Sequence, residues 1–263
     1  MRVAVYGNLI HDKVVTVDSK IHFSESNQCI MSDRVGGIAN FARAVEFGNL
    51  FDFELVSSVG DDYSGNFVID KLQSSPISNI NVVPGAKTSS AVNLVQRDIG
   101  LRTGFVDWGV CATVGMKPID ADWHHLMYLD RMNISDILAF SGAGIVSADL
   151  CDSHHIDSVL DKIAHVDVLF CSSVDHNRHR DLNSCKLPFK SIFVMHQPGF
   201  CSVSYKHSGL EFDSTEVVPG LDVLGAGDYF AANCIASIIN TTKVDIQAVH
   251  DNTLKLLRAQ SNV

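Results

Sequence analysis

Residues 221–230 read Leu-Asp-Val-Leu-Gly-Ala-Gly-Asp-Tyr-Phe, and apolar residues recur after them with the period of a helix. This stretch predicts a glycine-rich turn that enters a helix. Backbone N–H groups at a helix start have no partner within the helix and carry positive partial charge. Gly225 and Gly227 have no Cβ that would keep an anion away from these groups. A phosphate can therefore bind at this helix start.

Asp228 falls in the first turn of the same helix, where the helix dipole favours its ionised form. A carboxylate beside a bound phosphate can accept a proton from a hydroxyl nucleophile. Taken alone, the residues also allow a structural interpretation. In that interpretation the two glycines make a tight turn, and Asp228 supports the start of the helix.

A second glycine-rich stretch, residues 35–40, reads Val-Gly-Gly-Ile-Ala-Asn and also leads into an amphipathic helix. Apolar residues at 38, 41, 42 and 45 give the helical period, and Gly48 marks its end. Asn40 falls in the first turn, where its amide and the backbone N–H groups can contact a ligand. The alternative is that Gly36 and Gly37 only allow close packing of a strand against the helix.

Short apolar runs alternate with segments of helical period along most of the chain, which predicts an α/β fold with a mostly parallel sheet. We expect strands at 3–6, 54–59, 126–129, 145–148, 168–170 and 192–195, and helices at 38–48, 65–72 and 156–163.

Two regions interrupt this alternation, residues 10–34 and residues 88–110. In the second region, two β-rich runs flank the turn residues 98–100, which predicts a hairpin. Neither region is followed by a crossover helix. Both are therefore assigned to a small β appendage inserted into a single α/β domain.

The composition excludes several classes of protein. The 263 residues are 46% hydrophobic and 19% charged, which fits a globular domain rather than a disordered chain. The formal net charge of −10 argues against a nucleic-acid partner, because such partners are bound largely through Lys and Arg. No apolar run approaches the ~20 residues of a membrane helix. The first apolar run is too short for a signal peptide, so we expect a cytoplasmic protein.

Three motifs occur together in this chain: Gly36-Gly37-x-x-Asn40, the run Val-Gly-Asp-Asp-Tyr-Ser-Gly at 59–65, and Asp222-x-x-Gly-Ala-Gly-Asp228. Their order and spacing resemble those of the ribokinase-like (PfkB-type) carbohydrate kinases, over about residues 3–240. The resemblance implies a three-layer α/β/α sandwich over residues 1–263, with a small β-sheet lid formed by segments near 10–34 and 88–110. It also implies an ATP-dependent kinase that uses Mg²⁺.

The resemblance further implies a role for each matching residue. Asp228 would be the catalytic base, and the amides of Gly225, Ala226 and Gly227 would form the anion hole for the transferred phosphoryl group. The acceptor, a small sugar or nucleoside, would be bound by Asp12, Gly36, Gly37 and Asn40. The lid often forms a dimer interface in this family, which implies a homodimer.

The nucleotide side departs from the family pattern. Ser172 and Asp175 stand where the family has an Asn-x-x-Glu motif, and Asp175 is the candidate for holding Mg²⁺ through a water. Of a Thr-x-Gly-x-x-Gly motif only Gly199 is present, and Asp222 is followed by valine instead of threonine. These four residues are assigned to the nucleotide, and a monovalent cation site is left open.

Two other functions stay open beside the sugar kinase. One is a ligand-binding protein without catalytic activity on the same scaffold, which the altered motifs at 172–175 and 194–199 would suit. The other is a kinase for a heterocyclic alcohol.

Overall fold

The computed structural model describes residues 1–18, 21–22, 24–72, 79–96, 101–112, 116–151, 159–172, 192–197, 200–205, 208–213 and 224–261. Its main sheet has nine strands, in the order β13 (Ser208–Asp213), β12 (Phe200–Tyr205), β11 (Ile192–Gln197), β10 (Val168–Ser172), β9 (Ile145–Asp149), β8 (Trp123–Met127), β1 (Arg2–Tyr6), β4 (Asp52–Gly60) and β5 (Asn79–Val83). Its helices are α1 (Ile38–Gly48), α2 (Tyr63–Leu72), α3 (Ile134–Ala139), α4 (Leu160–Ile163), α6 (Ala226–Thr241) and α7 (Ile246–Ser261).

The main sheet is parallel from β5 to β11, and β12 and β13 extend it with antiparallel pairings. This arrangement confirms the predicted α/β class. Of the predicted helix at 156–163, only the part from residue 159 on is described, and it contains α4. None of the described helices is both long and apolar enough to cross a membrane.

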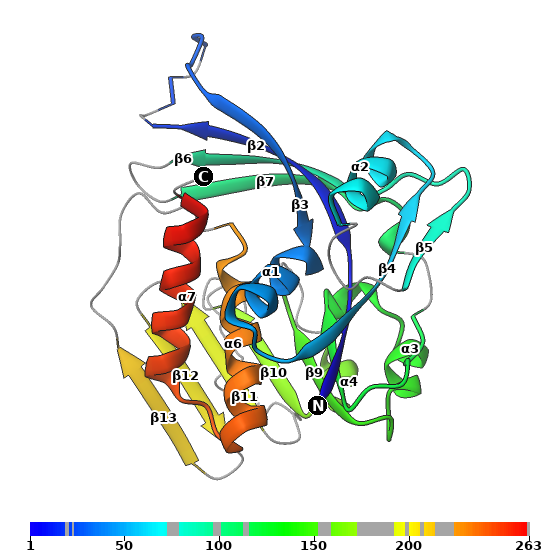
Figure 1. Cartoon of the computed structure of the whole chain (residues 1–263), viewed down its shortest axis with the longest axis vertical. Coiled ribbons are helices and arrows are strands. Elements are labelled where there is room, and N and C mark those ends of the chain that lie inside the picture. The colour runs from blue at the N-terminus through cyan, green and yellow to red at the C-terminus, as the bar shows by residue number, and fades with distance from the viewer. Residues whose placement is uncertain are drawn as a thin grey trace.

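Helices cover both faces of the main sheet (Figure 1). Val3 and Val5 of β1 share a hydrophobic cluster with buried residues of α1, α6 and α7. The alternate residues Ala4 and Tyr6 belong to a second cluster, together with buried residues of α3 and α4. Because side chains alternate across a strand, β1 is buried on both faces. The molecule is therefore the three-layer sandwich that the sequence predicted.

The strand predicted at 126–129 begins and ends earlier than expected, as β8. Its first half, Trp123-His124-His125, carries polar atoms and gave no apolar signal, yet all three residues are buried. Trp123 Nε1 donates a hydrogen bond to Ser147 Oγ at 2.7 Å, and Ser147 Oγ lies 2.8 Å from His125 Nδ1. Buried polar groups are tolerated when they are paired in this way. The strand ends at Tyr128, whose φ of 61° turns the chain.

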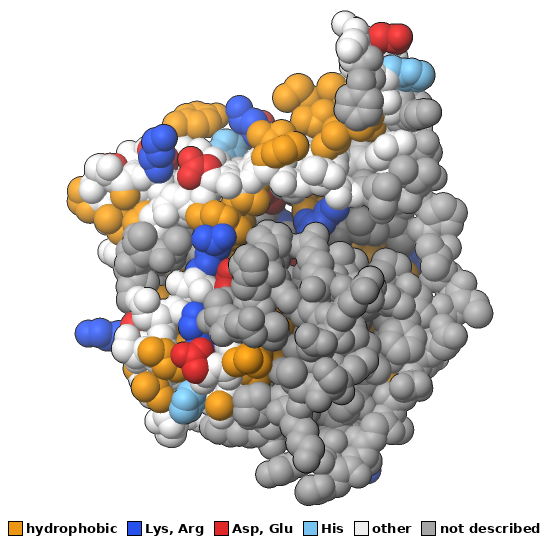
Figure 2. All heavy atoms as spheres, turned by 180° about the vertical axis from the view of Figure 1, so that it is seen from behind, with side chains coloured by type: hydrophobic (Ala, Val, Ile, Leu, Met, Phe, Trp, Pro, Cys, Tyr) orange, Lys and Arg blue, Asp and Glu red, His pale blue; other side chains and the backbone are white. Residues whose placement is uncertain are grey.

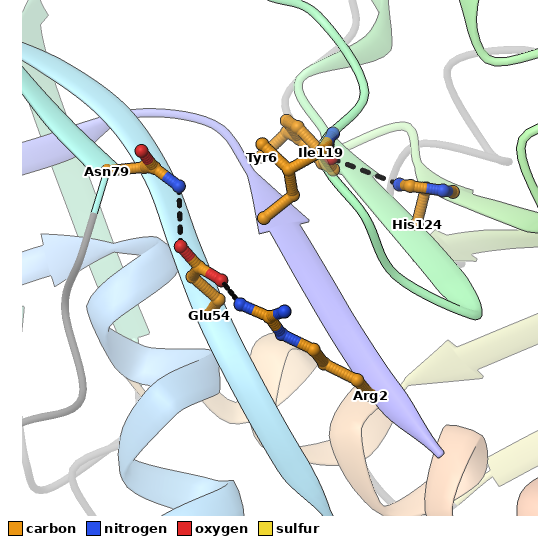
Figure 3. A network of polar contacts seen from close by, with 6 residues as sticks. All are labelled: Arg2, Tyr6, Glu54, Asn79, Ile119 and His124. Atoms are coloured by element: carbon orange, nitrogen blue, oxygen red, sulfur yellow. Dashed lines mark hydrogen bonds and ion pairs between the residues drawn. The ribbon is translucent and has the colours of Figure 1, made fainter.

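Figure 3 shows polar contacts that join β1 to its neighbours in the main sheet. Arg2 of β1 forms an ion pair with Glu54 of β4, and Asn79 of β5 donates a second hydrogen bond to the Glu54 carboxylate. Glu54 is buried, so both partners offset the cost of removing its charge from water.

At the other end of β1, Tyr6 links the strand to β8 (Figure 3). The Tyr6 hydroxyl accepts the backbone N–H of Ile119 at 3.0 Å and lies 3.0 Å from His124 Nδ1. Burial raises the pKa of Tyr6 to about 12, so the hydroxyl stays protonated. His124 Nε2 lies 3.2 Å from the carbonyl oxygen of Ala143 and donates to it, which leaves Nδ1 to accept the hydrogen bond from the Tyr6 hydroxyl.

A separate sheet of four strands lies above the main sheet in Figure 1. Its strands, in order, are β3 (Ile30–Gly37), β2 (Leu9–Val17), β6 (Ser90–Gln96) and β7 (Leu101–Asp107). The antiparallel pair β6 and β7 is the predicted hairpin. β2 pairs with β3 antiparallel and with β6 parallel, so the two segments that interrupt the α/β alternation meet in one sheet.

The register of the four strands defines two faces of this small sheet. Asp12 lies opposite Arg34 of β3 and Ala91 of β6, and these side chains point to the same face. Lys13, the next residue along β2, points to the opposite face with Val92. We call the face of Asp12 the inner face and the face of Lys13 the outer face.

Candidate active site

Two helices, α1 and α6, begin beside each other, and a hydrogen bond joins their first turns. The amide nitrogen of Asn40 donates to Asp228 Oδ2 at 2.9 Å, although the two residues are 188 positions apart in the sequence. Both residues were singled out from separate motifs. The structure therefore brings the predicted base and a predicted acceptor-binding residue into direct contact.

Gly225 is the N-cap residue of α6 and has a φ of 88°, which L side chains rarely adopt. A Cβ at this position would lie 2.8 Å from Asn40 Cγ, so a side chain here would also push α1 away from α6. Because glycine has no side chain, the N-cap residue itself places nothing over the first N–H groups of the helix. The segment Gly225, Ala226, Gly227 thus has the backbone arrangement that suits an anion such as phosphate.

Gly36 and Gly37 allow β2 to approach the start of α1. A Cβ on Gly36 would overlap the carboxylate of Asp12, and a Cβ on Gly37 would overlap the carbonyl oxygen of Asn8. That carbonyl accepts the first N–H of α1, from Ile38, at 2.9 Å. The glycines therefore serve close packing, and the group they bring close is the predicted ligand-binding residue Asp12.

Asp12 is buried, and burial raises the pKa of its carboxyl to about 6. Arg34, Arg102 and Arg43 act in the opposite direction through their positive charges, as does a hydrogen bond from Asn93. The effect of burial is larger than that of the three arginines and the hydrogen bond together.

Arg43, one turn after Asn40 on α1, determines which way the Asn40 amide faces. Its Nη1 donates to Asn40 Oδ1 at 2.6 Å, and its Nη2 donates to the backbone carbonyl of Val35. Since the amide oxygen accepts from Arg43, the amide nitrogen is the atom that faces Asp228. Arg43 positions Asn40, and the sequence gave no signal for it beyond its place three residues along the same helix face.

Asn8 is a second residue that the sequence analysis missed. It lies two residues after the end of β1, and its side chain is buried. Among the described residues, its amide nitrogen has no hydrogen-bond partner. An unpaired buried donor is costly in a folded protein. A polar residue shortly after a central strand is the one sequence signal that could have identified it.

The inner face of the small sheet reaches the loop before α6. Val14 of β2 and Val95 of β6 form a small hydrophobic cluster with Leu224, the residue before Gly225. On the outer face, His11 hydrogen-bonds with Ser64 of α2 across 2.9 Å and stacks on Phe67 with ring centroids 4.2 Å apart. The small sheet is thus held against the main domain from both of its faces.

Most residues predicted for the nucleotide lie outside the described part of the chain. Asp175, Gly199 and Asp222 fall there, and Ser172 is described only as the last residue of β10. Among the described residues, no group of three or more His, Cys, Asp or Glu side chains could hold a metal ion. The assignments of these four residues, and of Asp175 to Mg²⁺, stay predictions.

No protein-family model and no curated protein sequence matches the chain, whereas its structure matches solved structures over nearly its full length. A ribokinase from Thermotoga maritima has a TM-score of 0.75 at 19% identity, and the match covers 97% of this chain and 91% of the ribokinase. A nucleoside kinase from Burkholderia thailandensis in complex with inosine has a TM-score of 0.78 at 12% identity, and the match covers 97% of this chain and 90% of the nucleoside kinase. An Arabidopsis thaliana ribokinase complexed with ribose and ATP has a TM-score of 0.72 at 16% identity, and the match covers 97% of this chain and 91% of that ribokinase. The chain therefore has the ribokinase fold, as the motif resemblance implied.

Substituting Gly36 with alanine should destabilise the protein through its contact with Asp12. The added Cβ would overlap the carboxylate, and such overpacking costs about 1–3 kcal/mol in the free energy of unfolding. In an Asp12→Ala background most of this loss should disappear, because the overlapping group is gone. Urea unfolding of the two single variants and the double variant measures this coupling. Equal losses in both backgrounds would show that the contact does not exist.

Asp12 should make the protein less stable as the pH rises. Its pKa is about 6 in the folded chain, compared with 3.8 for an aspartate carboxyl in water, so the folded state holds the proton more tightly. This contribution is complete below the unfolded pKa and is lost as the pH passes the folded pKa. Relative to Asp12→Asn, the wild type should lose about 2–3 kcal/mol in the free energy of unfolding between about pH 4 and about pH 7.

The comparison with Asp12→Asn also removes the effect of His125, which both proteins share. Burial lowers the pKa of His125 to about 3, so this residue destabilises the fold as the pH falls, opposite to Asp12. A difference between wild type and variant that does not change with pH would show that Asp12 titrates alike in both states.

Proposed function

We propose that the chain is an ATP-dependent kinase that transfers the γ-phosphoryl group to a hydroxyl of a small sugar or nucleoside. The observation that carries this proposal is the hydrogen bond between Asn40 and Asp228. It joins the acceptor motif at the start of α1 to the glycine-rich start of α6, in a chain with the ribokinase fold. A hydroxyl bound near Asn40 would lie beside both a carboxylate and a helix N-terminus.

Asp228 acts in this proposal as the general base that accepts the proton of the attacking hydroxyl. The amides of Gly225, Ala226 and Gly227 stabilise the negative charge of the transferred phosphoryl group. Each such donor lowers the activation free energy by about 3 kcal/mol. A general base raises the rate by a factor of ~10²–10⁴. Phosphoryl transfer depends mainly on positioning and charge stabilisation, so these groups can suffice.

The acceptor is bound between α1 and the inner face of the small sheet, by Asp12, Gly36, Gly37 and Asn40. Gly36 leaves room for the Asp12 carboxylate, so this group can lie close to the start of α1. The small sheet acts as a lid, and its contact with Leu224 supports this role because it covers the loop before the anion hole. A closed lid excludes water, which would otherwise compete as the acceptor.

The nucleotide is assigned to Ser172, Asp175, Gly199 and Asp222, and Mg²⁺ to Asp175 through a water. The similar ribokinase that was solved with ribose and ATP supports the choice of nucleotide. Mg²⁺, when bound, would neutralise charge on the phosphates of ATP. Sugar and nucleoside acceptors both stay in the proposal, because the similar structures include a ribokinase with ribose and a nucleoside kinase with inosine.

We also propose that two copies of the chain associate through the outer face of the small sheet. Exposed hydrophobic side chains lie on the upper lobe that this sheet forms (Figure 2). Met31, Val92 and Phe105 are 67%, 43% and 67% exposed, and the strand register places all three on the outer face. Contiguous exposed apolar residues on a sheet mark an interaction surface.

Replacing Asp228 with asparagine should lower turnover by about two decades or more while ATP-Mg²⁺ still raises the melting temperature. Asparagine keeps the shape of the side chain and cannot accept the proton. Asp251→Asn, an exposed aspartate of α7, is the matched control and should keep wild-type turnover. Turnover is measured as ADP release with a panel of sugars and nucleosides.

Wild-type turnover in Asp228→Asn would remove this residue from the role of base. An acceptor that binds without any nucleotide shift or ADP release in the wild type would instead identify a binding protein on the kinase scaffold.

Replacing Phe105 with lysine should convert a dimer into a monomer, because a charge would then lie in the apolar interface. Phe47→Lys is the control, since Phe47 is 60% exposed on α1, away from the small sheet. Sedimentation equilibrium gives the mass of each protein. A monomeric wild type, or a dimer that survives Phe105→Lys, would contradict the proposed interface.

A further inference from the structure

Three arginines surround Asp12 on the acceptor side of the site. Arg34 lies opposite Asp12 on the neighbouring strand β3, Arg102 comes from β7 on the same inner face, and Arg43 comes from α1. All three are close enough for their charges to act on the Asp12 carboxyl. We call these three residues the arginine cluster.

Among the described strand residues that face inward on the small sheet, Arg34 and Arg102 carry positive charge and Asp12 alone carries negative charge. Arg43 of α1 adds a third positive charge near Asp12. This local excess of positive charge occurs in a protein whose net charge is −10, so it is not a general feature of its surface. A cleft with a local positive potential attracts and retains anionic ligands.

The three arginines differ in what else they bind. Both Nη atoms of Arg43 donate to protein oxygens, those of Asn40 and Val35, which assigns Arg43 to positioning Asn40. Arg34 is partly exposed on β3, which pairs with β2, and Arg102 is exposed on β7, which β6 separates from β2. Gly104 of β7 leaves room for the side chain of Asn93, because a Cβ there would lie 2.9 Å from Asn93 Oδ1.

We propose that the acceptor carries an anionic group, a phosphate monoester or a carboxylate, which Arg34 and Arg102 bind beside Asp12. This inference rests on the proposed kinase function and specifies its substrate class. Guanidinium groups bind phosphate and carboxylate oxygens through paired N–H donors, with more geometric specificity than an ammonium group. Asp12 and Asn93 then bind the hydroxyls, and the arginines bind the charged end of the same molecule.

The experiment compares matched pairs of probes that differ in charge: ribose with ribose 5-phosphate, fructose with fructose 6-phosphate, and glucose with glucuronate. Binding to the full chain is measured by calorimetry without nucleotide, so the result does not depend on turnover. At least one anionic probe should bind about tenfold or more tightly than its neutral partner. Arg34→Gln and Arg102→Gln should each remove most of this preference and leave the neutral partner unaffected.

Lys13→Gln is the control variant, because it removes one positive charge from the outer face of the same strand. It should leave the preference intact. The two sugar phosphates and glucuronate also distinguish a phosphate site from a carboxylate site. A preference for the phosphates alone would identify a phosphate monoester, and a preference for glucuronate alone would identify a carboxylate.

The proposal is overturned if every neutral probe binds as tightly as its anionic partner. It is also overturned if the arginine variants weaken both partners equally, because the arginines would then act on something other than the charge of the acceptor. Turnover of a neutral sugar with no preference for anions would support the kinase function and contradict this inference. Arginine-dependent binding of an anionic probe without ADP release would support the anion site and contradict the kinase function.

Discussion

The hydrogen bond between Asn40 and Asp228 requires the first turns of α1 and α6 to stay in contact, and much of the surrounding structure follows from this requirement. Gly225 is needed because any side chain would enter the space that Asn40 occupies. Arg43 is needed because it holds the amide oxygen and leaves the nitrogen for the carboxylate. The same residues therefore determine both the packing of α1 against α6 and the orientation of the Asn40 and Asp228 side chains.

The proposed acceptor side satisfies a second constraint, which is the burial of the Asp12 carboxyl group. Removing the Asp12 charge from water is costly, and the nearby arginines offset only part of that cost. The position is tolerated because Gly36 gives the carboxylate room and Asn93 supplies a hydrogen bond. In the proposed function, hydroxyl groups of the acceptor would donate further hydrogen bonds to this carboxyl group and stabilise it.

The parts of the fold that depend on local pattern could be predicted from the sequence. The buried strand β1, the helix α1 and the β6–β7 hairpin each carry their own periodicity and turn residues. The first half of β8 could not be predicted, because its stability depends on the pairing of Trp123 and His125 with Ser147 of the neighbouring strand β9. Arg34 and Arg102 were missed for a similar reason. The place of Arg34 opposite Asp12 depends on the antiparallel pairing of β2 with β3. The place of Arg102 on the same face depends on the pairings of β2 with β6 and of β6 with β7.

The order of the contributing residues along the chain also affects how the molecule folds. The residues of the acceptor side occur before residue 108, whereas Asp228 comes near the end of the chain and meets Asn40 across 188 positions. Closing a segment of that length costs more conformational entropy than a local contact, and long-range contacts of this kind slow folding. During synthesis, the strands that hold the acceptor residues leave the ribosome well before α6 exists. A chain that ends before α6 thus contains every strand of the small sheet but lacks the proposed base Asp228, so the proposed activity requires the complete fold.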